Sequence, residues 1–330
     1  MTLTQPQTLL THPPHPFAKA LIDNSEKGLR DVIAFLHQIK SVNLPIKSRH
    51  KDYSSFDGGR HTRTQLPIFW AIDRKHWKGG ETGFARLRLL LDHGAELNVV
   101  HESRGVTPLY VALHEWCNMR LVSFLVENGA DPNFGDDICP VLVGCIKHSS
   151  FTPPLLVAHK IKFLLEKGTN PDQFDERGVS ALMLAINCRR HDPSVKEALL
   201  QWGANPLLRT ALPFIQRPLN PYTFYPTWTR KEASGRDISP IELACAWGST
   251  STLKIVLSHI PSSQHTAELM QRPLYLACGA KGGLSTVEVC LDHIPQNDPK
   301  MHLLLQGALY VACRNRRVDT IHFLITKIIG

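Results

Sequence analysis

The feature that most constrains how this chain can fold is a short pattern that recurs along it. The clearest copy runs from Gly105 to Asn133 and reads GVTPLYVALHEWCNMRLVSFLVENGADPN. It has a turn-like start, two apolar runs and a turn-like end. Further copies of its first half begin at Gly178, Ile238, Gln271 and Gln306. A pattern repeated in this way predicts small structural units rather than one catalytic segment.

The first apolar run of this copy predicts a short helix. Pro108 suits the first turn, where its missing N–H costs nothing, and Thr107 can cap that turn. Leu109, Ala112 and Leu113 lie three and four residues apart and therefore share one face. The small Ala112 lets a neighbouring helix approach closely.

The second apolar run predicts a second amphipathic helix, with Leu121, Phe124 and Leu125 on its buried face. Gly129 then permits the left-handed backbone that ends a helix. A single pair of such helices cannot bury its own apolar faces. The repetition therefore predicts stacked pairs that share a continuous core.

These residues resemble the ankyrin repeat, whose pattern runs G-x-T-P-L-H-x-A-A, then V-x-x-L-L, then G-A-D-x-N. The resemblance implies an all-α, ankyrin-repeat-like solenoid of stacked helix-turn-helix units. It implies about eight repeats, with the first and fourth degenerate. Their marker positions are Pro16, Pro67, Pro108, Pro140, Ala181, Pro240, Pro273 and Ala308.

The chain departs from the regular pattern in three places. Insertions are expected at Ser41–Arg63 and Leu207–Arg236, and the last units carry SHIPSS and DHIPQN where the G-A-D turn should be. The histidine that normally follows the marker by two positions is a tyrosine or absent. The expected organisation is a degenerate N-terminal repeat (1–46), ankyrin-like repeats (47–206), an aromatic and proline-rich insertion (207–236) and C-terminal ankyrin-like repeats (237–330).

Composition and charge exclude several classes of protein. No apolar run is long enough to cross a membrane, and the N-terminus lacks the features of a secretory signal. The net charge of +8 comes from 37 basic and 29 acidic residues, without a dense basic block, so nucleic acid is a less favoured partner than protein. We expect no cofactor, no metal, no membrane partner, and a cytoplasmic or nuclear location.

The resemblance also implies that a protein partner, acidic in character, binds a concave face. The positions facing that groove lie six to eight residues after each marker, and basic and aromatic residues are common there. They are Asp73, Arg74, His114, Glu115, Trp116, Lys147, His148, Arg189, Arg190, Trp247, Lys281, Arg314 and Arg316. The alternative for each cation is an ordinary solvated charge, and for Trp247 a gap-filling role.

The second insertion adds Tyr222 and Trp228 among several prolines. This mixture is typical of a packed loop, which either binds a ligand or covers a weak joint between units. A second hypothesis is therefore an atypical enzyme, or a small-molecule-binding protein with a pocket between the groove and residues 207–236. Its candidate catalytic residues are His114, Glu115, His148 and Asp73. Recognised catalytic motifs are lacking, so an interaction scaffold is the favoured interpretation.

The segment Thr320–Gly330, TIHFLITKIIG, is more apolar than one neighbouring unit should require. It predicts a contact with a partner, with a second copy through the C-terminal helix, or with another part of the chain.

The cysteines lie mostly in apolar runs and form no CxxC pair, which predicts buried thiols rather than disulfides. A reductant should therefore leave the melting temperature of the protein unchanged. A decrease of many degrees on adding dithiothreitol would contradict this expectation.

Overall fold

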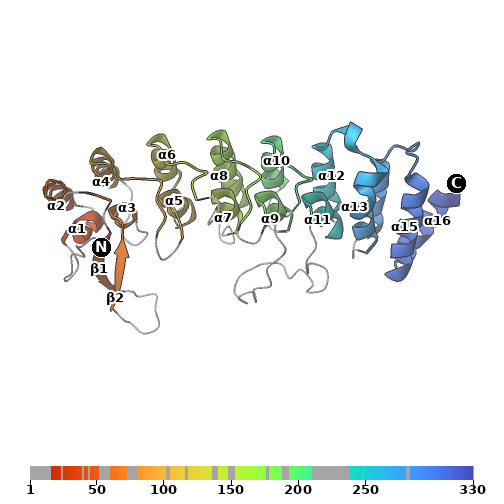
Figure 1. Cartoon of the computed structure of the whole chain (residues 1–330), viewed down its shortest axis with the longest axis horizontal. Helices are drawn as coiled ribbons and strands as arrows, with labels where there is room; N and C mark the ends of the chain where they lie inside the picture. The colour runs from red at the N-terminus through yellow and green to blue at the C-terminus, as the bar shows by residue number, and fades with distance from the viewer. Residues whose placement is uncertain are drawn as a thin grey trace, which may run out of the picture. The chain divides into compact units, whose positions relative to one another are not determined.

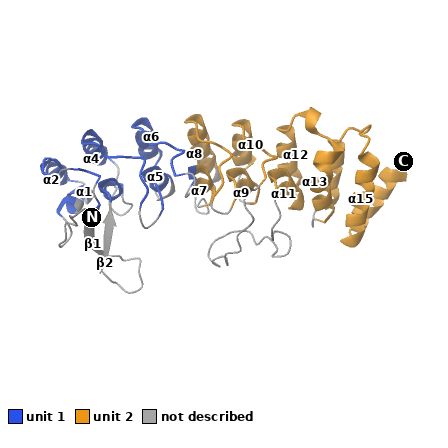
Figure 2. Cartoon of the chain, viewed as in Figure 1, with its two compact units in different colours: residues 1–141 blue, residues 142–330 orange. Residues whose placement is uncertain are grey.

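The computed structural model divides the chain into two compact units, residues 1–141 and 142–330 (Figure 2). It describes residues 16–23, 25–38, 41–43, 45–51, 60–72, 80–101, 105–115, 118–135, 140–147, 153–175, 178–187, 193–209, 238–247, 249–279 and 283–329. In these ranges the α-helices follow one another in pairs (Figure 1). The predicted class is confirmed: the fold is built from helix-turn-helix units.

The described residues of unit 1 form three helix pairs. They are α1 (Pro16–Ile22) with α2 (Glu26–Leu36), α3 (Pro67–Ala71) with α4 (Glu81–Asp92), and α5 (Pro108–Glu115) with α6 (Met119–Glu127). The first helices α1 and α3 pack together, as do the second helices α2 and α4. The ring of Phe84 on α4 lies 5.3 Å from the ring of Phe124 on α6, so the second helices form a continuous layer.

Unit 2 repeats this two-layer arrangement (Figure 1). Its helices are α7 (Val141–Lys147), which starts at the unit boundary, α8 (Pro154–Glu166), α9 (Ala181–Asn187), α10 (Pro193–Gln201), α11 (Pro240–Ala246), α12 (Thr250–Ser258), α13 (Ala267–Gly279), α14 (Gly283–Asp292), α15 (Met301–Arg314) and α16 (Val318–Ile329). One layer consists of α9, α11, α13 and α15, and the other of α8, α10, α12, α14 and α16.

Most predicted details of the clearest copy are confirmed, except that Phe124 is half-buried rather than buried. The hydroxyl of Thr107 accepts a hydrogen bond from the N–H of Tyr110 at 3.1 Å, as an N-cap should. Leu109, Ala112 and Leu113 are buried. Gly129 has φ of 98°, the left-handed conformation that ends α6.

A side-chain hydrogen-bond ladder joins successive turns. Asn98, in the turn after α4, donates to the carbonyl of Gly129 at 3.1 Å and accepts from the N–H of Asp131 at 2.8 Å. Asp172 repeats the second contact with the N–H of Asn205 at 2.8 Å. The partners of both N–H bonds are 33 residues apart, which is the period of the repeat. The recurring Asn or Asp of the turn therefore sets the spacing between successive helix pairs.

The first insertion contains a β-hairpin that the sequence did not predict. Strands β1 (Ile46–Lys51) and β2 (Arg60–Gln65) pair antiparallel, with Ile46 opposite Gln65 and Lys51 opposite Arg60. Asn43, just before β1, makes the ladder bond to the N–H of Glu96 at 3.0 Å. The ladder therefore continues across this insertion between partners 53 residues apart.

The last two pairs differ from the predicted start positions. Helix α13 begins at Ala267 and contains Pro273 in its interior, and α15 begins at Met301, well before Ala308. The reason is local: without a G-A-D turn, the chain forms helix earlier. A contact of Asp298 takes the place of the ladder bond between these pairs. Its carboxylate accepts hydrogen bonds from the N–H of Ala267 at 2.8 Å and from the N–H of Lys300 at 2.8 Å.

Glu242 occupies the position where the repeat pattern has histidine, and it is buried at the start of α11. It forms a capping box with Ser239. One of its oxygens also accepts a hydrogen bond from Arg209 at 2.9 Å and forms an ion pair with Arg272 at 3.2 Å. A buried carboxylate with two guanidinium partners thus links the turn before the second insertion to α13.

We predict that Glu242→Ala lowers the free energy of unfolding by about 3 kcal/mol, because it leaves two arginines without their shared anion and removes a cap. Urea denaturation measures the change. The matched control is Glu268→Ala, which removes an exposed ion pair with Lys300 and should change stability little. Equal effects of the two substitutions on the free energy of unfolding would show that the buried ion pairs of Glu242 stabilise the fold no more than an exposed ion pair does.

Candidate functional site

The predicted groove residues that the structure describes lie at the C-terminal ends of first helices. Lys147 is the last residue of α7, Trp247 directly follows α11, and Arg314 is the last residue of α15. His114 and Glu115 end α5 in the same way, although their side chains are outside the described part. The predicted positions therefore lie at the same place in each helix pair, the C-terminal end of the first helix.

Trp247 is the aromatic residue of this set whose environment is defined. It is the C-cap of α11, with its backbone N–H bonded to the carbonyl of Leu243 at 3.1 Å. Its side chain is 37% exposed, whereas the preceding helix residues from Ile241 to Cys245 are buried. An exposed indole at the end of a buried helix is available for contact with a ligand.

The other predicted site residues lie outside the described residues. They are Asp73, Arg74, Trp116, His148, Arg189, Arg190, Tyr222, Trp228 and Lys281. Their grouping with Trp247 stays a prediction, as does the pocket proposed beside residues 207–236.

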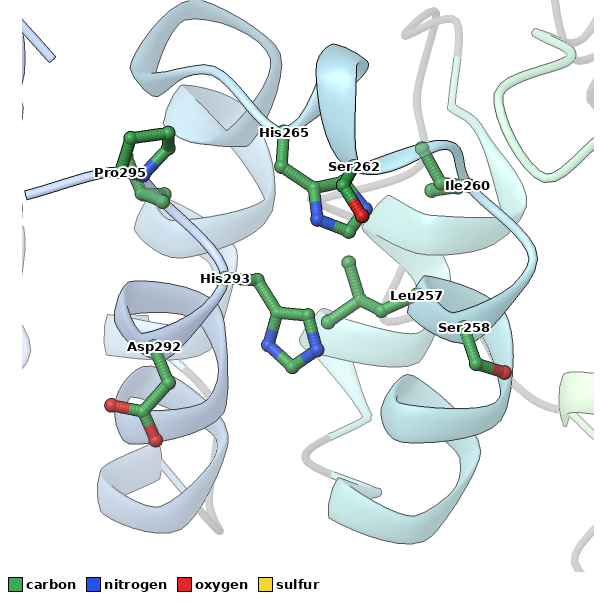
Figure 3. Close-up of a pocket in the computed structure, with 9 residues that line it drawn as sticks. Leu257, Ser258, Ile260, Ser262, His265, Asp292, His293 and Pro295 are labelled. Atoms are coloured by element: carbon green, nitrogen blue, oxygen red, sulfur yellow. The ribbon is translucent and has the colours of Figure 1, made fainter.

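The structure contains a cavity of about 460 Å³ that the sequence did not predict. It lies in unit 2 between the turn that follows α12 and the turn that follows α14 (Figure 3). Leu257, Ser258, Ile260, Ser262, His265, Asp292, His293, Ile294 and Pro295 line it. SHIPSS and DHIPQN supply most of this lining, so the segments that replace the G-A-D turn create the cavity.

Two histidines dominate the chemistry of this cavity. The rings of His265 and His293 have centroids 5.5 Å apart and an interplanar angle of 63° (Figure 3). Nδ1 of His293 lies 2.8 Å from the carbonyl oxygen of Val289, which fixes that ring at the end of α14. His265 is buried, and its Nε2 has no hydrogen-bond partner among the described residues.

The surroundings of His265 favour its neutral form. Burial lowers the pKa of His265 below its ordinary value of 6.5, and the neighbouring His293 lowers it further. The carboxylate of Asp292 also borders the cavity but points away from both rings (Figure 3). In the described residues, no group of three or more His, Cys, Asp or Glu side chains could hold a metal ion.

The position of His293 follows a repeated rule that could have been found from the sequence. His93 and His259 occupy the same place after α4 and α12, and Nδ1 of each approaches the carbonyl four residues earlier, at 2.8 Å and 3.0 Å. His265 follows no such rule. It faces His293 only because two turns distant in sequence are neighbours.

The ankyrin-repeat model matches residues 104–137, the segment that holds α5, α6 and the Asp131 turn. That segment is an ankyrin repeat. The other helix pairs fall outside the match, although the turn ladder extends the ankyrin geometry to Asn43 and Asn205.

No curated protein matches the chain. Among the described residues, no helix is long and apolar enough to cross a membrane. The ankyrin repeat is therefore the observation from which a function can be argued, since repeats of this kind bind protein partners.

The histidine pair predicts a pH dependence of stability. The folded state holds the pKa of His265 low, so the unfolded chain takes up its proton at higher pH than the folded chain does. The stabilising contribution is therefore complete above about pH 6.5 and is lost as the pH falls below that value.

The free energy of unfolding of the wild type should decrease from pH 7.5 to pH 5.5, two values that bracket the unperturbed histidine pKa of about 6.5. We expect this decrease to be smaller in His265→Leu. Urea denaturation at the two pH values measures it. The control His322→Gln changes an exposed histidine on α16 and should keep the wild-type slope. If His265→Leu also keeps that slope, the buried imidazole is not its source.

Proposed function

We propose that this chain is an interaction scaffold that binds a protein partner along the C-terminal ends of its first helices. The observation that carries the proposal is the exposed Trp247 at the end of α11, in a layer of first helices packed side by side. Tryptophan is strongly enriched among the residues that contribute most to protein–protein binding. A row of equivalent helix ends offers an extended surface on which a partner can make several such contacts.

The charge of the surface favours an acidic partner. Lys147 and Arg314 end their helices at positions equivalent to that of Trp247, and Arg74, Arg189 and Arg190 are proposed to extend the row. Arginine pairs with carboxylates through two parallel hydrogen bonds and also stacks on aromatic rings. An acidic or aromatic-bearing peptide segment is the ligand that this chemistry suits best.

The proposal places the protein in a reducing compartment, cytoplasmic or nuclear. Burial raises the pKa of the Cys278 thiol to about 12, and contact with Cys290 raises that of Cys245 well above its ordinary value. Thiols held protonated in this way are poor nucleophiles and resist oxidation, which suits a structural role.

The test compares two tryptophans of similar exposure in different layers. Trp247 ends a first helix and is 37% exposed, and Trp202 follows the second helix α10 and is 42% exposed. We predict that Trp247→Ala weakens partner binding by about 2 kcal/mol, or roughly thirtyfold in Kd, as does Trp116→Ala. Trp202→Ala should leave binding unchanged. Each should alter stability by about 1 kcal/mol or less.

The full-length chain first captures its partner from a lysate of the native cell, and mass spectrometry identifies it. Titration calorimetry with the purified partner then measures the affinity of each variant. If Trp202→Ala weakens binding and Trp247→Ala does not, the partner uses the layer of second helices, and the proposed surface is wrong. If Trp247→Ala unfolds the protein, that indole is a packing residue.

A further inference from the structure

The outer face of the α15–α16 pair is apolar and exposed. Leu303 and Tyr310 on α15 are each 67% exposed. They lie seven residues apart, which is two helical turns, so they share one face of the helix. On α16 the exposed apolar residues are Val318, Ile325 and Ile329, at 61%, 38% and 81%. The remaining large apolar residues with comparable exposure in the described chain are scattered singly. This face, the α15–α16 face, is defined by these five side chains.

The preceding pair shows what such a face contacts when it is covered. Tyr275 on α13 lies directly against Gly307 on α15, so closely that a Cβ built on Gly307 would be 1.8 Å from the tyrosine oxygen. Tyr310 holds the same place in α15 as Tyr275 holds in α13, in the matching segments LYVAC and LYLAC. The covered tyrosine thus requires a glycine, or a residue nearly as small, on the helix opposite.

The cysteines of these two segments also differ in exposure. Cys278, three residues after Tyr275, is fully buried, whereas Cys313, three residues after Tyr310, is exposed. Tyr310 therefore repeats the side chain with which α13 contacts the next helix pair, without a helix pair against it in the described structure.

Charge distinguishes between possible occupants of this face. Arg314, Arg316 and Lys327 are exposed around it, and Asp319 is the single acidic residue in the segment 301–329. A second copy docked face to face would bring two such sets of cations together, and like charges across an interface are unfavourable. A helix with acidic flanks would pair with them instead.

We propose that the α15–α16 face docks an amphipathic helix of a partner protein, with a small residue opposite Tyr310 and carboxylates beside the apolar contact. Helices commonly bind in this way, by laying an apolar stripe with residues spaced three and four apart into a complementary surface. The apolar contact of this site, centred on Tyr310, is separate from Trp247, although Arg314 borders both surfaces. Substitution of Tyr310 or Trp247 therefore alters one surface and leaves the other intact.

The probe is a helix-stabilised peptide that copies residues 300–316. It keeps Gly307, which lies against Tyr275 of α13, and the buried α15 residues Leu304, Leu305, Ala308 and Ala312, and it has glutamate at the other positions. A second peptide has lysine at those positions. A third is the glutamate peptide with Gly307→Leu, which fills the space that a tyrosine would occupy.

Fluorescence anisotropy with the full chain should show binding of the glutamate peptide. The lysine peptide and the Gly307→Leu peptide should each bind at least about tenfold more weakly, because one loses charge complementarity and the other loses the close approach. Tyr310→Ala in the protein should weaken binding of the glutamate peptide by about tenfold or more. The matched control is Leu155→Ala, which removes an apolar side chain that is 76% exposed on α8, and should have no effect.

Circular dichroism and melting temperature establish that both variants fold as the wild type does. The proposal is overturned if the glutamate peptide fails to bind, if the lysine peptide binds equally well, or if Tyr310→Ala leaves the affinity unchanged. Sedimentation velocity tests the other occupant. A dimer that Tyr310→Ala dissociates would show that a second copy covers this face.

Discussion

Each helix pair depends on the next for the burial of one of its faces, and the rest of the structure follows from this dependence. The first helices from α1 to α11 are short, so each of these pairs has little interior of its own. Fully burying a leucine or phenylalanine side chain stabilises a fold by about 1.5–3 kcal/mol, and here helices pack both within a pair and against the neighbouring pair. Leu109, Leu113 and Leu121 are buried, although each lies on a helix too short to be stable alone.

Stacking requires a fixed offset between pairs, and polar contacts in the turns provide it. Asn98 and Asp172 each bind a backbone N–H 33 residues further on, so the register between pairs does not depend on apolar contacts alone. The C-terminal pairs lack the G-A-D sequence but keep the principle, because Asp298 binds the N–H of Ala267. The replacement turns leave a cavity with two imidazoles in it. The absence of the regular G-A-D turn is therefore accompanied by a cavity that brings two histidine side chains together.

The sequence predicted what local rules determine. Pro67, Pro108 and Pro240 begin helices, Thr107 caps one, and Gly129 ends another, because each effect depends on residues within one turn of the chain. It failed where the outcome depends on residues distant in sequence. The meeting of His265 with His293 and the ion pairs of Glu242 with Arg209 and Arg272 are of this kind. The early starts of α13 and α15 were missed because the marker residue was assumed to keep its place in a unit that has lost its turn.

A stacked fold leaves few positions free to determine binding, since most side chains are committed to neighbouring pairs. The freedom lies at helix ends and at faces that no pair covers. These two kinds of surface differ in what they can recognise. Trp247 lies at a helix end, where we propose that a ligand crosses several helix pairs, whereas Tyr310 lies on an exposed helix face, where we propose that a single helix docks. Fold alone does not determine function. In this chain the distinction can be drawn because Tyr275, one pair earlier, shows the contact that we propose for Tyr310 with a partner helix.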